Sequence, residues 1–203
     1  MPPDTAAPER ATDTPARPIE FETARLRLRQ WRTSDFAPFA AMGADSRVME
    51  FFPEVLSAVE SHAMARRIRA LIAARGWGLW AVEVRGGARF IGFVGLHEPL
   101  AELPFAPCVE IGWRLAPAYW GHGYATEAAR AVLAVGFERI GLDEIVSFTS
   151  APNLRSQAVM RRIGMIADGT FEHPAISHGS PLREHVLYRL RRTHWNDANR
   201  PAS

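Results

Sequence analysis

Two glycines separated by one residue, Gly121 and Gly123, stand just before a stretch of helix-forming residues that opens at Thr126. The start of a helix leaves backbone N–H groups without acceptors and carries the positive end of the helix dipole. Glycines before it let the chain turn tightly and let a phosphate approach the backbone. The spacing predicts an anion-binding loop, although a short Gly-x-Gly before a helix also serves as a plain turn.

A dinucleotide is the main rival ligand for this loop. Its fingerprint contains a third glycine, which is absent here, and its loop follows the strand almost at once. Five residues separate the expected strand 109–115 from Gly121. Asp143 and Glu144 lie about where a ribose-binding acid would fall, but the loop follows several expected strands instead of the first one. The pattern therefore favours a different phosphate-bearing ligand.

The residues around the loop predict a mixed order of strands and helices. Ser57 and Glu60 have capping-box spacing at the start of one helix, and Gly76 is its natural stop. A crossover of the length of 126–140 requires the strands on either side of it to run parallel. Periodicity predicts strands over 25–31, 77–85, 89–97, 109–115, 144–150 and 185–190, and helices over 33–42, 57–76, 126–140 and 156–163. We therefore expect a single α/β (α+β) domain.

Length and composition predict one globular domain. The 203 residues are 47% apolar and 23% charged. Proline-rich residues 1–18 are expected to form a disordered tail, followed by a domain over 19–192 and a flexible C-terminal tail over 193–203. No apolar run approaches the ~20 residues that span a bilayer, and no secretory signal is visible. We expect a cytoplasmic protein with no membrane partner.

Arginine supplies all 24 basic residues, and the formal net charge is only +2. This balance does not predict nucleic acid as a partner. Arg25, Arg27 and Arg29 alternate with leucines, so we interpret them as the solvated face of the first strand. Cys108 is the only cysteine, which excludes an internal disulfide and a thiolate zinc cluster, and no other metal-ligand cluster is visible.

Two segments resemble the GNAT superfamily of N-acetyltransferases. The first joins Glu110-Ile111-Gly112-Trp113-Arg114-Leu115 to the glycine loop 120–126, and the second runs from Asn153 to Met165. The second segment and the opening 22–29 resemble the RimJ/RimL-type branch. The likeness covers about residues 19–190. It implies a mixed, mostly antiparallel sheet, flanked by helices, whose central parallel strands 109–115 and 144–150 splay apart.

The resemblance implies acetyl-CoA as co-substrate. Its pantetheine arm would lie between the splayed strands, and its pyrophosphate would sit on the glycine loop. The resemblance implies that Asn153 hydrogen-bonds the pantetheine, and its competing role is to cap the following helix. Trp120 departs from the Gln or Arg usual at the start of the loop. The implied cofactor-binding residues are Trp113, Leu115, Gly121, His122, Gly123, Tyr124, Ala125, Thr126 and Asn153.

The resemblance also suggests two catalytic groups. Glu110 is the first candidate for the base, with His97 and Glu98 as alternatives. The competing interpretation is that Glu110 is an exposed strand carboxylate or pairs with an arginine. Many members carry a tyrosine acid seven residues after the asparagine, where this chain has Met160, which cannot donate a proton. Ser156 is the nearest hydroxyl on that helix and fits the serine acid suggested for the branch.

We therefore expect direct acetyl transfer from acetyl-CoA to a primary amine in a ternary complex. The acceptor stays open among a protein N-terminus, a peptide and a small-molecule amine, and relatives often form homodimers. The alternative is a non-catalytic acyl-CoA-binding or sensing domain, which would not need Glu110 or Ser156. Candidates for the acceptor pocket are Trp31, Phe51, Phe52, the segment 171–174, His185 and Tyr188.

Overall fold

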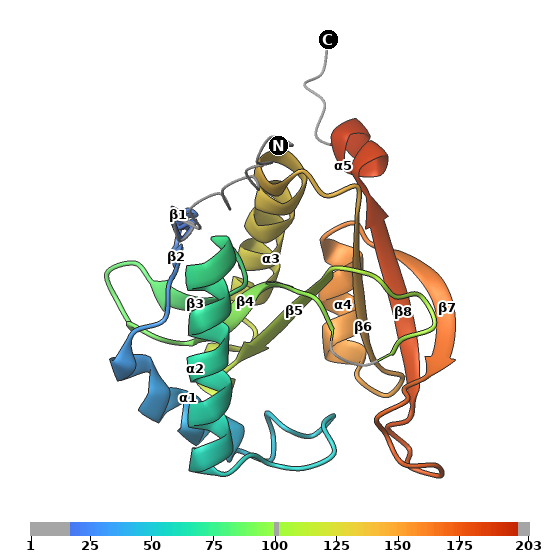
Figure 1. Ribbon diagram of the computed structural model, residues 1–203, viewed down its shortest axis with the longest axis horizontal. Coiled ribbons are helices and arrows are strands. Elements are labelled where there is room, and N and C mark those ends of the chain that lie inside the picture. The colour runs from blue at the N-terminus through green and yellow to red at the C-terminus, as the bar shows by residue number, and fades with distance from the viewer. Residues whose placement is uncertain (1–16, 100–101, 199–203) are drawn as a thin grey trace, which may run out of the picture.

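The computed structural model describes residues 17–99 and 102–198, and its centre is one eight-stranded sheet (Figure 1). The strand order is β1-β2-β3-β4-β5-β6-β8-β7. The strands are β1 (Phe21–Glu22), β2 (Leu26–Arg29), β3 (Leu79–Val84), β4 (Gly92–His97), β5 (Glu110–Leu115), β6 (Glu144–Ser150), β7 (Ile166–Glu172) and β8 (Glu184–Arg191). The mixed α/β fold class is confirmed.

Antiparallel pairing joins all neighbouring strands except β5 and β6, which run parallel. These two strands share a single paired position, Glu110 opposite Val146. Figure 1 shows them running apart from there, with the wide end toward Leu115. The predicted splayed parallel pair is therefore present at the centre of a mostly antiparallel sheet.

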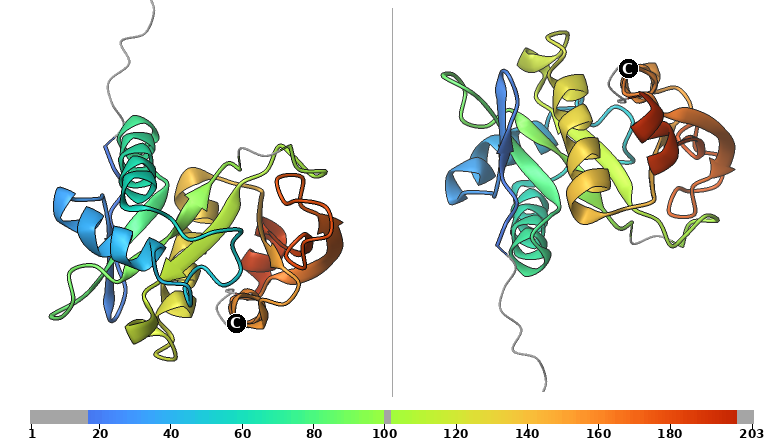
Figure 2. Two further views of the ribbon diagram at one scale, coloured as in Figure 1. Left: turned by 90° about the horizontal axis from the view of Figure 1, so that it is seen from below. Right: turned by 90° about the horizontal axis from the view of Figure 1, so that it is seen from above.

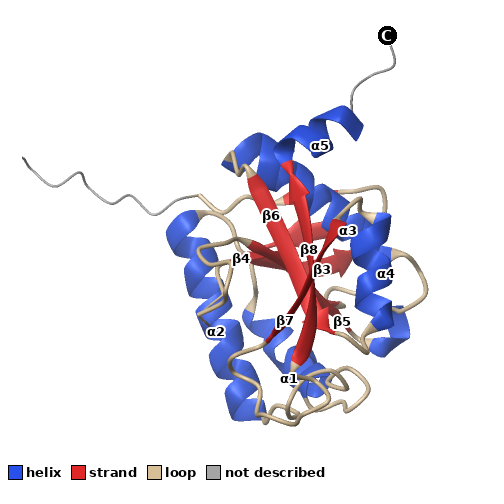
Figure 3. Ribbon diagram, turned by 90° about the vertical axis from the view of Figure 1, so that its right-hand side faces the viewer, coloured by secondary structure: helices blue, strands red, loops and turns tan. Residues whose placement is uncertain are grey.

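Helices cover both faces of the sheet. On one face lie α1 (Phe36–Gly43) and α2 (Ala58–Arg75), and on the other lie α3 (Tyr124–Ala134) and α4 (Leu154–Arg162) (Figure 2). The side view shows the sheet between these two layers (Figure 3). The remaining elements are the 3-10 turns η1 (Thr33–Asp35) and η2 (Pro117–Tyr119), the π-helical turn η3 (Val135–Ile140) and the helix α5 (Arg192–Ala198). Within the described residues, no helix has the length and apolarity needed to cross a bilayer.

Local signals set the boundaries of α2 as predicted. Oγ of Ser57 accepts from the N–H of Glu60 at 3.2 Å, and Oε2 of Glu60 accepts from the N–H of Ser57 at 2.9 Å. This reciprocal capping box satisfies backbone donors that the first turn leaves free. At the other end Gly76 adopts a left-handed φ of 85°, a conformation that costs other residues about 1–2 kcal/mol.

Several predicted boundaries differ from the structure. The helix expected over 126–140 begins at Tyr124, ends its α geometry at Ala134 and continues as η3. The helix expected from Ser156 begins at Leu154, because Asn153 is its cap. The strands expected over 77–85 and 89–97 are shorter at 79–84 and 92–97.

Two exposed segments were predicted from the sequence. Residues 192–198 form the short helix α5 at the start of the expected C-terminal tail; residues 199–203 and residues 1–16 of the expected N-terminal tail lie outside the described residues. The other prediction, of a solvated arginine face on the first strand, is wrong in part. Arg29 is not on a solvated face. It is 1% exposed, because Asp35 and Glu83 neutralise it inside the protein.

Candidate active site

A cleft of about 1970 Å³ opens where β5 and β6 diverge. Its walls come from the loop between α1 and α2, from α2 itself, from β5 and from the glycine loop with the starts of α3 and α4. It brings together all but one of the predicted site residues: Glu110, Trp113, Leu115, Gly121, Gly123, Tyr124, Ala125, Thr126, Asn153 and Ser156. The exception is His122, whose exposed side chain lies outside the cleft.

The glycine loop leads directly into the first turn of α3. Gly121 and Gly123 have φ values of 78° and 79°, and a side-chain carbon built at Gly121 would meet nothing within 4 Å. The N–H groups of this first turn have no intrahelical acceptor. Arg25 steadies the loop, because its Nη1 donates to the carbonyl of His122 at 3.0 Å. The loop therefore offers an open, positively polarised cradle with the form expected of a phosphate site.

The edge of β5 that faces the splay carries free backbone groups. Backbone N–H and C=O groups alternate sides along an antiparallel strand. The N–H of Ala116 bonds to Ile91 of the β3–β4 connection, so the groups of Trp113 and Leu115 point to the opposite side, toward β6. The carbonyl of Leu115 accepts from Nε1 of Trp120 at 2.7 Å. Trp113 lies beyond the last pair of β5 with β6, so its backbone can pair with an extended ligand.

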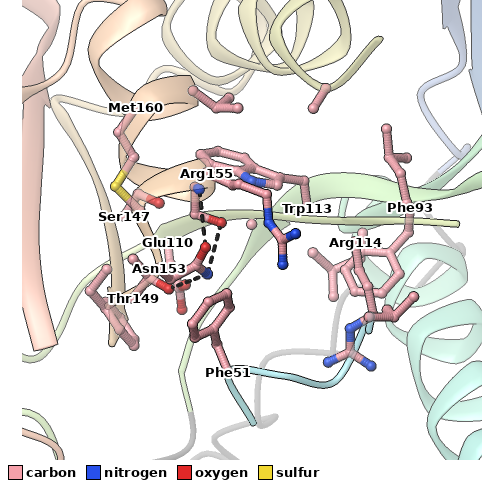
Figure 4. A pocket seen from close by; sticks show the side chains of 18 of the residues that line it. Phe51, Phe93, Glu110, Trp113, Arg114, Ser147, Thr149, Asn153, Arg155 and Met160 are labelled. Carbon is pink, nitrogen blue, oxygen red and sulfur yellow. Dashed lines mark hydrogen bonds between the residues drawn. The ribbon is translucent and has the colours of Figure 1, made fainter. Parts of the chain in front are cut away.

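Asn153 lies at the start of α4, and both the oxygen and the nitrogen of its side-chain amide form hydrogen bonds there. Its Oδ1 accepts from the N–H of Ser156 at 3.2 Å, so it is the helix cap. Its Nδ2 donates to Oγ1 of Thr149 at 2.9 Å and to Oγ of Ser156 at 3.1 Å (Figure 4). Because Oγ of Ser156 is used as an acceptor, its own proton is free to be donated into the cleft.

Glu110 and His97 form a pair at the end of the cleft where β5 meets β6. Oε2 of Glu110 lies 3.0 Å from Nε2 of His97. Burial of the His97 ring favours its neutral form, but the hydrogen bond and the negative charge of Glu110 outweigh burial, so the pKa of His97 is raised. A carbon at the Cβ position of Gly112 would lie 3.9 Å from the Glu110 carboxylate and 4.0 Å from that ring. Glycine therefore leaves open space beside both groups.

This arrangement matches a known family. The model for the acetyltransferase (GNAT) domain matches residues 25–166. The chain belongs to the GNAT acetyltransferase family. Among curated proteins it is 29% identical to the uncharacterized N-acetyltransferase YnaD of Bacillus subtilis (strain 168), over 88% of this chain and 100% of that protein. As a family member the chain is an acetyltransferase enzyme.

Two further relatives illustrate the range of the similarity. An FsC-acetyl coenzyme A-N(2)-transacetylase of Aspergillus fumigatus is 32% identical over 63% of this chain and 55% of its own length. The crystal structure of an acetyltransferase (GNAT family) from Bacillus anthracis superposes with a TM-score of 0.72 at 27% identity. That match covers 86% of this chain and 99% of the other chain.

The GNAT cleft contains residues that sequence reasoning did not single out. Arg155 of α4 lies 4.7 Å from the ring centre of Trp120 and 5.6 Å from that of Phe51, and it forms an ion pair with Glu50. Arg114 lines the opposite wall. The sequence offers no signal for either, because an arginine on a strand or helix is ordinarily a solvated residue.

The candidates for the acceptor pocket separate into two groups. Phe51, Phe52, His173 and His185 line the cleft, and the two histidine rings lie 4.8 Å apart. Burial lowers the pKa of both His173 and His185. Trp31 and Tyr188 are instead buried in the core, where Nε1 of Trp31 donates to the carbonyl of Leu79.

Proposed function

We propose that this GNAT enzyme transfers an acetyl group from acetyl-CoA directly to a primary amine in a ternary complex. The observation that carries the proposal is the meeting, in one cleft, of the glycine loop, the free edge of β5 and the Glu110–His97 pair. The block from Asn153 to Met165 supports placing the chain in the RimJ/RimL-type branch.

The residues present fit acetyl-CoA, which supplies the acetyl group as a thioester. The open cradle at Gly121 and the free first-turn N–H groups would hold its pyrophosphate. The carbonyl of Trp113 and the N–H of Leu115 would pair with the pantetheine arm between the splayed strands. The amide of Asn153 is already engaged as a cap, so a contact with pantetheine would use its remaining acceptor capacity.

Amine acetylation needs a proton removed, an oxyanion stabilised and a proton returned. Glu110, hydrogen-bonded to His97, would accept the proton of the acceptor amine. The backbone N–H of Trp113 faces the splay and is the candidate donor to the oxyanion. Oγ of Ser156 keeps its proton for the departing thiolate, because Asn153 occupies its acceptor side.

The proposal is tested by calorimetric titration of acetyl-CoA, followed by measurement of thiol release with a panel of primary amines. We expect micromolar binding that Gly123→Trp abolishes, and amine-dependent release of CoA. Binding without turnover for any amine would favour the non-catalytic acyl-CoA-sensing alternative. Absence of binding would contradict the assignment of acetyl-CoA as co-substrate.

A further inference from the structure

One wall of the cleft contains a buried arginine, Arg114, that forms no ion pair with any carboxylate among the described residues. Of the described arginines only Arg29 and Arg114 are buried, at 1% and 9% exposure. Arg29 is held by Asp35 and Glu83. For Arg114, Nε and Nη1 have no hydrogen-bond partner among the described residues, and no carboxylate there pairs with it. An unpaired buried charge opposes folding, so a ligand that neutralises it is the simplest reason for its presence.

The surroundings of Arg114 are aromatic and open to the cleft. Its guanidinium carbon lies 4.2 Å from the ring centre of Phe52 and 5.5 Å from that of Phe93. Figure 4 shows Arg114 beside Phe93 at the wall of the pocket next to α2, with Phe51 across from it. Burial lowers the pKa of Arg114 to about 10, so the group stays charged at neutral pH.

Arg114 is on the opposite face of β5 from the phosphate cradle. Phe93 pairs with Arg114 across the strands, and its ring packs on Phe39 of α1, so both residues face the α1–α2 layer. Successive side chains of a strand point to opposite faces, which puts Glu110 and Gly112 on the face of Arg114. Trp113 points to the α3 side, where the glycine loop begins. The coenzyme phosphates therefore have their own site and do not account for Arg114.

We propose that Arg114 binds a carboxylate of the acceptor, so that the substrate is an amine that also carries a carboxylate. This inference rests on the proposed acetyl transfer. A planar guanidinium matches a planar carboxylate in a charge-assisted, two-pronged hydrogen bond, while the neighbouring aromatic rings cover the apolar part of the molecule. Glu110 and Arg114 are four residues apart, or about 13 Å along the strand between their Cα atoms. Both line the same cleft on the same face of β5, and Gly112 between them carries no side chain, so a molecule that spans this distance can meet both groups.

The experiment compares each acid with its own carboxamide. The probes are the L-amino acids and the ω-amino acids from β-alanine to 5-aminopentanoate, titrated into the full chain saturated with CoA, where no acetyl group is available. Thiol release is then measured with acetyl-CoA. For the wild-type protein we expect at least one carboxylate to bind and react about tenfold or more better than its carboxamide, the usual size of a charged hydrogen bond.

Variants separate recognition from folding. Arg114→Gln is expected to abolish the preference for the acid without changing the affinity for acetyl-CoA, and Arg114→Lys to retain part of it. Because the variant removes an unpaired buried charge, Arg114→Gln should melt at no lower temperature than the wild type. Arg66→Gln, an exposed arginine of α2 outside the cleft, is the control and should keep the full preference.

The outcomes distinguish this inference from the proposed function. A wild-type protein that binds acetyl-CoA but treats acids and amides alike, or binds none of the acids, overturns the carboxylate assignment alone. The carboxylate assignment is also overturned if Arg114→Gln still prefers acids over their carboxamides, or if Arg114→Gln melts at a markedly lower temperature than the wild type. Failure of the wild type to bind acetyl-CoA instead contradicts the acetyl transfer itself.

Discussion

Nε2 of His97 lies 3.0 Å from Oε2 of Glu110, because the antiparallel register of β4 and β5 places the two residues directly opposite each other. A carboxylate bonded to a protonated histidine accepts the proton of an amine less readily than one bonded to a neutral histidine. Under the proposed mechanism, the rate of acetyl transfer therefore depends on the protonation state of His97.

The rate at saturating substrates should depend on this pair. Since the pKa of His97 is raised above its ordinary ~6.5, kcat is expected to rise with pH through a midpoint above that value. Glu110→Gln should lower kcat by about 10²–10⁴-fold, the usual contribution of a general base, with acetyl-CoA affinity retained. A pH series of kcat for both proteins checks this. An unchanged kcat in Glu110→Gln would reduce the pair to a structural contact.

The raised pKa of His97 also predicts how the stability of the fold changes with pH. The His97–Glu110 pair stabilises the fold below about pH 6.5, and this contribution is lost as pH rises through the folded-state pKa of His97. In His97→Gln the deficit in melting temperature should therefore be larger at pH 6 than at pH 9. An equal deficit at both values would show that packing, not charge, accounts for the effect.

The glycine loop can be tested with a matched pair of glycines. Gly121 and Gly86 have φ values of 78° and 73°, and a Cβ added at either position would meet no atom within 4 Å. Alanine at either position should cost about 1–2 kcal/mol in stability, the price of a left-handed residue with a Cβ. Only Gly121→Ala should weaken acetyl-CoA binding, measured by calorimetry. Equal loss in both would show that general destabilisation, not the cradle, was responsible.

Substitutions can separate the capping role of Asn153 from the proposed proton-donor role of Ser156. Asn153→Asp retains the acceptor for the N–H of Ser156 but loses the donors to Thr149 and Oγ of Ser156, whereas Asn153→Ala also loses the cap and should cost about 1 kcal/mol. Ser156→Ala should lower kcat with little change in melting temperature. Thiol-release kinetics beside thermal melts distinguish the two effects. Normal turnover in Ser156→Ala would exclude this hydroxyl as the proton donor.

Glu127 anchors the first turn of α3 to the segment before β2. Its Oε1 accepts from Oγ1 of Thr23 at 2.6 Å, and its Oε2 accepts from Nε of Arg25 at 2.6 Å. Burial raises the pKa of Glu127, but these hydrogen bonds outweigh it, so the pKa is lowered. Its stabilisation is thus present above the unfolded value of ~4.3 and lost as pH falls through the folded-state pKa.

Glu127→Gln should therefore lower the free energy of unfolding by about 1 kcal/mol at pH 7, a modest value because Arg25 is half exposed. The difference from wild type should shrink below about pH 4. Denaturant unfolding at both pH values measures it. Glu22→Gln, which removes an exposed carboxylate paired with Arg85, is the control and should be close to neutral at both.

The features predictable from sequence are those fixed by neighbours in the chain. The box at Ser57 and Glu60 and the glycines before α3 act within a few residues, so their patterns carry the signal. The β5–β6 crossover follows from the order of elements alone. The exposed β7 was not predicted, because none of Ile166–Ala167-Asp168-Gly169-Thr170 is buried and the strand exists only by pairing with β8.

The burial and contacts of a side chain could not be predicted where they depend on residues distant in the sequence. Arg25, Arg27 and Arg29 alternate identically in the sequence, yet only Arg29 is buried, because Glu83 arrives from β3 across the sheet. Arg114 is buried by Phe52 and Phe93, which are distant in the chain. Glu110 and His97 were each recognised as candidate bases, but their contact depends on a strand register that no local pattern specifies.

Arg155 joins the two halves of the cleft, since it stacks on Trp120 beside the glycine loop and pairs with Glu50 in the loop between α1 and α2. We therefore expect a ligand that moves Trp120 or α4 to affect the loop that bears Phe51 and Phe52. Linkage makes this coupling reciprocal: the factor by which coenzyme changes acceptor affinity equals the factor by which acceptor changes coenzyme affinity. Arg155 is therefore the side chain through which we expect the coenzyme side and the acceptor side of the cleft to influence each other.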